Sequence, residues 1–283
     1  MQSHNTTWTE EIKSENSLWS VNYKEIWHYR DLLLMLVKRN FTNFYKQTIL
    51  GPIWFFIQPI LTTFIYVILF GQVAKLSTDG IPHMPFYLAG ITIWNYFSEC
   101  LSKNATVFKD NSGVFGKVYF PRLIMPLTIV VSGLMRFAVQ FALFIAVVIY
   151  YTFVEKSIHP NLWILMTPFL MLLMAGFAMG LGMIFSSLTT KYKDLVFLLT
   201  FGIQLFMYAT PVVYTVTSIP EKYKGFVEAN PLTGIFECFR YAYLGSGSFE
   251  SSSLIHSTII ISVLVFIGIL VFNKVEKSFM DTV

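Results

Sequence analysis

Arg136 is the charged residue of this chain whose position most strongly suggests a chemical role. It lies within residues 123–154, a run that otherwise contains no Asp, Glu, Lys or Arg and that is long enough to cross a lipid bilayer. A charge at the centre of such a span costs about 2.5–3.5 kcal/mol on insertion scales. We therefore expect Arg136 to face protein or an aqueous cavity, either in a structural contact with a carbonyl or beside a path through the membrane.

The sequence shows no pattern typical of a catalytic or metal site. Gly116 and Lys117 resemble the end of a P-loop, but Val118 replaces the Ser or Thr of that motif and Asn111 replaces its first Gly. There is no Gly-x-Ser-x-Gly elbow, and no metal-ligand spacing connects the histidines, which are His4, His28, His83, His159 and His256. We predict that the chain is not an enzyme, has no catalytic residue or metal, and does not hydrolyse ATP itself.

The composition is that of a membrane protein. Of the 283 residues 55% are hydrophobic and only 13% are charged, which is about half the charge of an ordinary soluble protein. The mean hydropathy is +0.59. An apolar chain with two cysteines is neither disordered nor a disulfide scaffold. We expect it to sit in a membrane and to have no nucleic-acid partner.

Six apolar runs predict an all-α protein with six transmembrane helices. A helix needs about 20 apolar residues to cross a bilayer. The second run contains Pro82 and Pro85, so we expect its helix to begin near Phe86 and to continue past Glu99. The runs are residues 47–74, 80–98, 123–154, 157–190, 195–220 and 251–273.

The basic residues predict the orientation. Most of the 20 Lys and Arg lie in the N-terminal segment, the loops between spans two and three and between spans four and five, and the C-terminal tail. By the positive-inside rule both termini are then cytoplasmic. Cys100 and Cys238 would lie toward opposite faces, so we predict no disulfide between them. The first long apolar run begins late, and we expect no removed leader.

The segments outside the spans divide the chain further. We expect an N-terminal cytoplasmic segment (1–28), an interfacial amphipathic helix (29–47), a six-helix membrane domain (48–275) and a cytoplasmic tail (276–283). The interfacial helix is either a plain anchor or a contact for an anionic head group or a diphosphate through its basic face, which includes Arg30, Lys38 and Arg39.

Two further segments are too apolar to float in water. The loop 104–120 should pack on the membrane surface or on a cytoplasmic partner. Residues 217–245 are broken by Pro220 and Pro231, and they predict two short helices that dip into the outer leaflet as a lid or as a gate.

Aromatic residues dominate the first and fifth spans. Most of them could simply face lipid or fill the core. Together they could also line a path for sugars, because the apolar C–H faces of a sugar ring pack flat on aromatic rings. The candidate lining residues are Trp54, Phe55, Tyr66, Phe201, Phe206, Tyr208 and Tyr214.

An ordered set of short motifs resembles a known family. Residues 47–54 (Gln-Thr-Ile-Leu-Gly-Pro-Ile-Trp) and Gln58-Pro59 open the first span. Further blocks follow in order at residues 117–124, 181–182, 191–194, 209–214, 219–223 and 230–233, with Arg240 after them. From about residue 29 to 275 this pattern resembles the permease subunits of type-2 ABC exporters, in the branch that exports lipid-linked O-antigen polysaccharide or teichoic acid.

The resemblance implies partners and a cargo. Such permeases form homodimers and pair with two copies of an ATP-binding subunit, so Mg-ATP would bind to that subunit and this chain would hold no cofactor. The cargo would be a polysaccharide on undecaprenyl diphosphate, crossing the bacterial inner membrane. The alternatives are a related exporter of teichoic acid, another lipid or a drug, a membrane-bound glycan-modifying enzyme, and an ion channel, for which no filter motif is present.

The resemblance also implies roles for segments. Spans one and five would form the conduit walls, and the helix at 29–46 would lie near the entrance for the lipid diphosphate. The loop 104–120 would be the coupling helix that docks on the ATPase, with Phe108, Lys109, Asp110 and Lys117. The segment 217–245 would form the outer gate, with Pro220, Asn230, Pro231 and Arg240.

Overall fold

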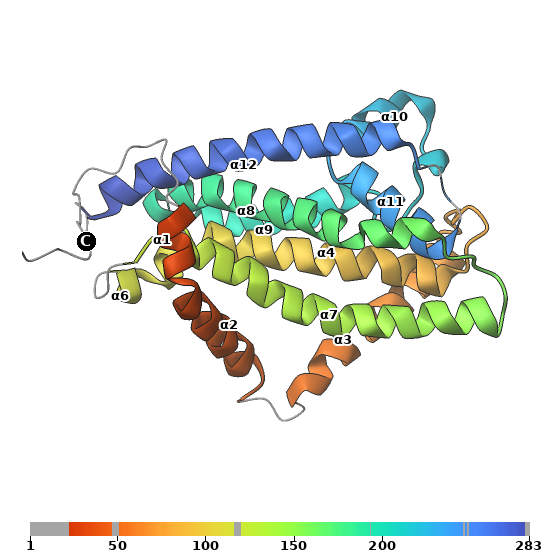
Figure 1. Cartoon of the computed structure of the whole chain (residues 1–283). Coiled ribbons are helices and arrows are strands. Elements are labelled where there is room, and N and C mark those ends of the chain that lie inside the picture. The colour runs from red at the N-terminus through yellow and green to blue at the C-terminus, as the bar shows by residue number, and fades with distance from the viewer. Residues whose placement is uncertain are drawn as a thin grey trace, which may run out of the picture.

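The computed structural model describes residues 23–46, 51–115, 120–192, 194–245, 247 and 249–280, and within these residues it is built of helices without strands (Figure 1). Four helices are long and apolar enough to cross a membrane. The expectation of an all-helical, multi-pass membrane protein is therefore confirmed. The four are Trp54–Val73, Ile124–Phe153, Leu162–Lys191 and Ser251–Val275.

Helix α4 (His83–Ala105) forms the centre of the bundle. It packs against α7 (Ile124–Phe153) and α8 (Thr167–Lys191), and Phe86, Tyr87 and Phe97 on it are fully buried. The helix begins at His83, three residues before the predicted start at Phe86. Pro85 is tolerated because backbone N–H groups in the first turn of a helix have no partner within the helix.

The bundle is closed by α12 (Ser251–Met280), which packs along α8. The two helices approach closely at Gly180 and Gly268, where a Cβ on Gly268 would lie 2.5 Å from the carbonyl oxygen of Gly180. A glycine is needed here because any side chain would separate the two backbones.

The fifth predicted span is shorter than expected. Residues 195–220 were expected to form one helix, but α9 (Leu195–Ala209) ends after 15 residues, which is about 22 Å. Thr210 is extended, with φ −109° and ψ 142°. The cause is Pro211, because a proline disfavours the helical conformation of the residue before it.

The N-terminal helices lie on the α7 side of the bundle (Figure 1). After α1 (Tyr23–His28), helix α2 (Arg30–Tyr45) buries Leu36 and Val37 and contacts α7. The chain then forms η1 (Gly51–Ile53), α3 (Trp54–Tyr66) and a π-helical continuation, η2 (Val67–Val73).

Short elements mark the two ends of the bundle. Helices α1, α5 (Val107–Asp110) and α6 (Ser112–Phe115) and the end of α12 lie at one end, which we call the α1 end. The opposite end, the α10 end, carries η3 (Leu162–Met166), η4 (Val216–Ser218), α10 (Glu221–Glu228) and α11 (Thr233–Leu244) (Figure 1).

Candidate functional site

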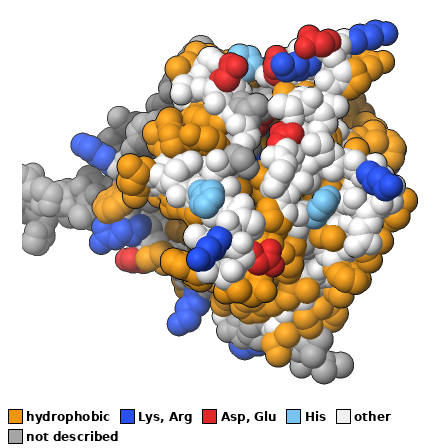
Figure 2. All heavy atoms as spheres, turned by 90° about the vertical axis from the view of Figure 1, so that its right-hand side faces the viewer, with side chains coloured by type: hydrophobic (Ala, Val, Ile, Leu, Met, Phe, Trp, Pro, Cys, Tyr) orange, Lys and Arg blue, Asp and Glu red, His pale blue; other side chains and the backbone are white. Residues whose placement is uncertain are grey.

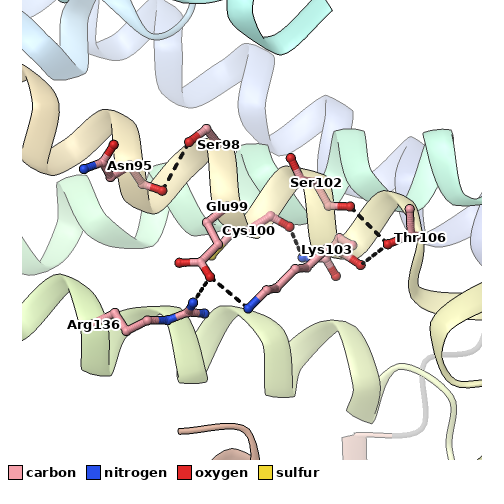
Figure 3. Close-up of polar contacts among 9 residues, drawn as sticks. Asn95, Ser98, Glu99, Cys100, Ser102, Lys103, Thr106 and Arg136 are labelled. Atoms are coloured by element: carbon pink, nitrogen blue, oxygen red, sulfur yellow. Dashed lines mark hydrogen bonds and ion pairs between the residues drawn. The ribbon is translucent and has the colours of Figure 1, made fainter. Parts of the chain in front are cut away.

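Arg136 contacts a carboxylate from the neighbouring helix. It is 8% exposed on α7, and its Nη1 forms an ion pair with Oε1 of Glu99 on α4 (Figure 3). The same Oε1 accepts Lys103, one turn further along α4, with an Nζ–Oε1 distance of 2.8 Å. The expectation that Arg136 faces protein is confirmed, and its partner here is an acidic side chain. We call Glu99, Lys103 and Arg136 the charged cluster.

Polar side chains continue this contact between α4 and α7. Asn95 donates from Nδ2 to Oε1 of Gln140 at 3.3 Å, one turn from Glu99, and Gln140 is buried. Each of these residues is an isolated polar position in an apolar run. The sequence therefore shows that these polar residues are unusual, but only the folded structure shows that they pair across two helices.

Helices α3 and α9 meet where the predicted conduit residues lie. Tyr66 on α3 donates its hydroxyl to Sδ of Met207 on α9, at 3.6 Å. The hydroxyl of Tyr214 donates to the carbonyl oxygen of Tyr208 at 3.0 Å. The two predicted walls are therefore adjacent, and the chain beyond α9 folds back on the end of that helix.

The seven aromatic candidates differ in exposure. Trp54, Phe201 and Tyr208 are 45%, 57% and 50% exposed. Phe55, in contrast, is buried and stacks on Phe41 of α2, with ring centroids 6.0 Å apart. Phe206 is half-buried and contacts the rings of core residues such as Trp94 at 6.1 Å. The open face of α9 also carries apolar residues that the sequence analysis did not select: Phe197, Leu198 and Leu205.

Arg240 and Asn230 hold the non-helical segment that follows α9. Arg240 is 5% exposed, and its guanidinium donates to the carbonyl oxygens of Pro211 at 2.7 Å, Tyr214 at 3.2 Å and Val212. Its Cζ also lies 3.9 Å from the ring centroid of Phe86. These bonds satisfy backbone acceptors that have no helical partner, as irregular backbone at membrane depth requires.

Asn230 completes the support from the other side. Its Nδ2 donates to the carbonyl oxygen of Ala209 at 3.2 Å and to Oγ1 of Thr210 at 2.9 Å, at the end of α9. The two proline candidates have different positions: Pro220 caps α10 at the exposed surface, and Pro231 is half-buried before α11.

A second set of hydrogen bonds at the α10 end, which we call the Asp79 tie, was not predicted from the sequence. Asp79, in the connection between η2 and α4, accepts from Oγ1 of Thr217 at 2.8 Å and 2.7 Å and from Oγ1 of Thr215 at 3.3 Å. Asp79 has a positive φ of 52°, an unusual conformation for a residue with a side chain. The connection from the first span is thereby fastened to the segment that follows α9.

The α10 end also carries a polar pocket. Figure 2 views this end and shows acidic, basic and histidine side chains set among apolar ones. The pocket has a volume of about 430 Å³ and lies where η4, α10 and the start of α12 meet; its lining includes Thr217, Lys224, Glu228, Glu237, Glu250 and His256. Within the described ranges no three His, Cys, Asp or Glu side chains are grouped as metal ligands. Cys100 and Cys238 are buried free thiols.

The coupling candidates point in different directions. Phe108 on α5 is fully buried and stacks on Phe272 of α12, with ring centroids 4.6 Å apart. Lys109 and Asp110 are exposed, and Oδ2 of Asp110 accepts from Oγ1 of Thr106 at 2.5 Å. Lys117 lies outside the described residues. The α5 segment is therefore anchored inward by an aromatic ring and presents charges outward.

The basic entrance candidates are exposed on α2. Arg30, Lys38 and Arg39 all lie open to the surroundings. Arg30 lies 5.4 Å from the ring centroid of Trp27 and 3.9 Å from the carboxylate of Asp31. Leu36 and Val37 of α2 face the bundle, and its exposed residues include Leu34 and Met35 as well as the three cations.

These features define a multi-pass helical membrane protein. A polar contact joins α4 and α7, and α3 and α9 carry exposed aromatic residues. Residues 31–244 match the ABC-2 type transporter family. The match covers most of the chain, and the chain belongs to this family.

Curated relatives include O-antigen export permeases. Two proteins named O-antigen export system permease protein RfbA, from Klebsiella pneumoniae, are 28% and 29% identical over 252 and 253 residues, which cover 89% of this chain and 94% of each relative. The protein of that name from Myxococcus xanthus is 24% identical over 263 residues, 92% of this chain and 98% of the relative. The polysialic acid transport protein KpsM of Escherichia coli is 22% identical over 236 residues, 82% of this chain and 89% of the relative.

Proposed function

We propose that this chain is the membrane permease of an ATP-driven exporter that moves an undecaprenyl-diphosphate-linked polysaccharide of the O-antigen type across the bacterial inner membrane. The observation that carries the proposal is the similarity, along nearly the whole chain, to permeases named for O-antigen export. The permease acts as a homodimer with two copies of an ATP-binding subunit. That subunit binds Mg-ATP and supplies the energy.

The conduit runs along the open faces of α3 and α9. Trp54, Phe201 and Tyr208 are large aromatic side chains that the single chain leaves partly uncovered. A second copy of the chain packed across these faces would enclose a path lined by rings. Aromatic rings hold sugars by contact with their C–H faces, and such contacts are individually weak, which suits a polymer that must slide.

Six membrane crossings fit this role when α4 and α9 are counted with the four long apolar helices. Helix α4 has 23 residues, about 34 Å, and most of them are buried; Glu99 is paired with Arg136, and Lys103 lies near the end of the helix. Helix α9 is short, and the non-helical residues 210–214 fold back on its end. Both termini are then cytoplasmic, and the α1 end is the cytoplasmic end of the bundle.

Coupling to the ATPase takes place at the α5 segment. Movement of an ATP-binding subunit against Lys109 and Asp110 is transmitted through Phe108, because its ring is stacked on Phe272 of α12. The exposed cations of α2, Arg30, Lys38 and Arg39, attract the anionic diphosphate to the entrance on the same side.

The outer gate is the segment 217–245 at the α10 end, which includes Pro220, Asn230, Pro231 and Arg240. Arg240 and Asn230 hold the non-helical residues that follow α9, so the segment can close the path between export cycles. Arg240 donates hydrogen bonds to backbone carbonyl oxygens of the residues that follow α9, and these bonds keep those residues in one conformation when the gate moves as a unit.

Another cargo within the family is the main alternative. The similarity to the polysialic acid transport protein KpsM is lower in identity and covers less of the chain. A teichoic acid, another lipid or a drug would use the same scaffold. A glycan-modifying enzyme is less well supported, because the relatives are transport permeases.

The test is loss and restoration of export in the bacterium that carries the gene. Deletion should remove the glycan from the cell surface and leave lipid-linked polymer inside. The wild-type gene should restore display, and the combined variant Trp54→Ala, Phe201→Ala, Tyr208→Ala should restore much less of it. Phe153→Ala is the control, because Phe153 is an aromatic residue that is 73% exposed at the end of α7 and is not one of the conduit candidates. Normal surface glycan after deletion would rule out the proposed cargo.

A further inference from the structure

The charged cluster has one more cation than a structural ion pair needs. Glu99 neutralises one positive charge, yet both Lys103 and Arg136 contact its Oε1, so the three side chains carry one net positive charge. One cation is enough to pair the Glu99 carboxylate inside the bundle, so burial of that carboxylate does not by itself explain the second one. Lys103 therefore needs an explanation beyond the pairing of Arg136.

The cluster can be reached from one side. The side chain of Lys103 is 46% exposed and that of Glu99 is 29% exposed, while that of Arg136 is 10% exposed. An anion that approaches the bundle meets Lys103 first and Arg136 last. Lys103 is therefore the outer member of the cluster and Arg136 the inner one, and Figure 3 shows the side chains of both meeting at the carboxylate of Glu99.

The Lys103 side of the cluster lies near the level of the membrane head groups. Helix α4 is about 34 Å long, and the hydrocarbon core of a bilayer is about 30 Å thick. The last turn of α4 therefore reaches the head-group level at the α1 end. Lys103 lies two residues before the end of α4 at Ala105, and Glu99 lies one turn deeper.

We propose that Lys103 and Arg136 form a binding site for the phosphate oxygens of a lipid-linked phosphate or diphosphate, and that Glu99 occupies this site when the lipid is absent. Oε1 of Glu99 is a single anionic oxygen that contacts both cations, which is the position that a phosphate oxygen would take. Arginine binds phosphate with two parallel N–H groups and lysine binds it as a point charge, so the pair suits a group with several oxygens.

This inference deepens the proposed function, because it names the place where the cargo's diphosphate is held, and to that extent it rests on it. Binding of the phosphate displaces the carboxylate of Glu99 by charge repulsion. When the lipid moves on, Glu99 returns to the two cations and competes against rebinding. The exchange keeps both cations paired in each state and allows the lipid to leave.

The main competing explanation is an ordinary helix pair. Glu99 and Lys103 are four residues apart, a spacing at which exposed Glu and Lys stabilise a helix by about 0.2–0.5 kcal/mol without any ligand. The chain offers a matched control for this explanation at the other end of the bundle. Lys224 and Glu228 have the same spacing, with an Nζ–Oε1 distance of 3.9 Å, and both are well exposed.

Binding of a prenyl diphosphate to the full-length permease in phosphatidylcholine nanodiscs tests the site. The probe is farnesyl diphosphate, with farnesol as the uncharged reference. We expect Lys103→Gln to weaken binding about tenfold, which corresponds to about 1.4 kcal/mol, and Lys224→Gln to leave it unchanged. Glu99→Gln should strengthen binding, because it removes the competing carboxylate and keeps the size of the side chain.

The opposite pattern would overturn the site. If Lys103→Gln binds farnesyl diphosphate as the wild type does, or if Glu99→Gln weakens binding in a protein that keeps its melting temperature, the cluster is structural only. Nanodiscs with phosphatidylglycerol distinguish the two sources of phosphate. If phosphatidylglycerol weakens binding of farnesyl diphosphate to the wild type but not to Lys103→Gln, phospholipid head groups also use the site. Because binding is measured without export, a different cargo would leave a positive result intact.

Discussion

Arg240 holds three backbone carbonyls in place, and its replacement gives the sharpest test of how the outer segment is built. In Arg240→Met the apolar stem is retained and the guanidinium is lost. The carbonyl oxygens of Pro211, Val212 and Tyr214 then lose their donor in a buried place. A buried polar group left unsatisfied costs about 1–3 kcal/mol, and the three losses overlap, so we expect a destabilisation of about 3–5 kcal/mol.

The assay uses thiols that the chain already contains. Cys100 and Cys238 are buried and free, so a thiol-reactive dye becomes fluorescent only as the bundle opens on heating. At about 2–4 °C per kcal/mol for a chain of this size, the melting temperature of Arg240→Met should fall by about 10 °C. The melting temperature of Arg240→Lys should fall by less, because an ammonium group can still reach one carbonyl oxygen.

Lys222→Met is the matched control for this series. Lys222 is exposed on α10 and lies near the ring of Tyr223, so its loss should leave the melting temperature within about 1 °C of the wild type, as is usual for surface sites. The reasoning is refuted if Arg240→Met melts with the wild type, because the carbonyls would then have another source of hydrogen bonds.

Three further changes test other contacts. Gly90→Ala places a Cβ against the carbonyl oxygen of Val212, so the dye assay should show a lower melting temperature, whereas Gly202→Ala, where a Cβ meets open space, should not. Phe108→Ala removes the stack on Phe272 and should destabilise the protein by about 3–5 kcal/mol. Lys109→Ala should leave stability unchanged and reduce glycan export. Normal export in the double variant Lys109→Ala, Asp110→Ala would contradict the coupling role. Asp79→Asn weakens the acceptor for Thr217 and Thr215, and hydrogen exchange at residues 215–218 should speed up; unchanged protection would show that the tie is not formed.

The sequence predicted the helices where apolarity alone decides the outcome. The first, third, fourth and sixth runs are long and nearly free of charge, and each is a membrane-length helix in the structure. The fifth run was overestimated because residues 210–220 contain no Asp, Glu, Lys or Arg, so the uncharged run continues past the end of the helix. Pro211 carried the signal for the boundary, through its effect on Thr210, and hydropathy does not register it.

The site was predicted less completely, since it depends on contacts between distant residues. Arg136 stands out in its run, and so does Glu99, but their spacing of 37 positions gives no indication that α4 and α7 bring them together. Arg240 was selected because it follows the ordered motifs that resemble the exporter permeases. Its role toward residues 211–214 follows only from the fold, because the partners are backbone carbonyls and leave no trace in residue type.

Phe55 shows the limit of reading aromatic residues by type. It has the same apolar neighbours as Trp54 and Phe56, yet it is buried against Phe41 while these two remain exposed. Residues 54–56 lie on one turn of α3 and point to different sides of the helix. The sequence does not show which side is buried, because this depends on where α2 packs. The exposed residues of α3 and α9 therefore remain the stronger candidates for the conduit.

Reconstitution with a labelled cargo tests the central claim most directly. Vesicles would contain this permease either alone or together with its ATP-binding subunit, and the inward-facing glycan of an undecaprenyl-diphosphate-linked polymer would be followed by its accessibility to an added lectin. We predict ATP-dependent passage only when both proteins are present, and no ATP turnover by the permease alone. Passage or ATP hydrolysis by the solitary permease would contradict the account.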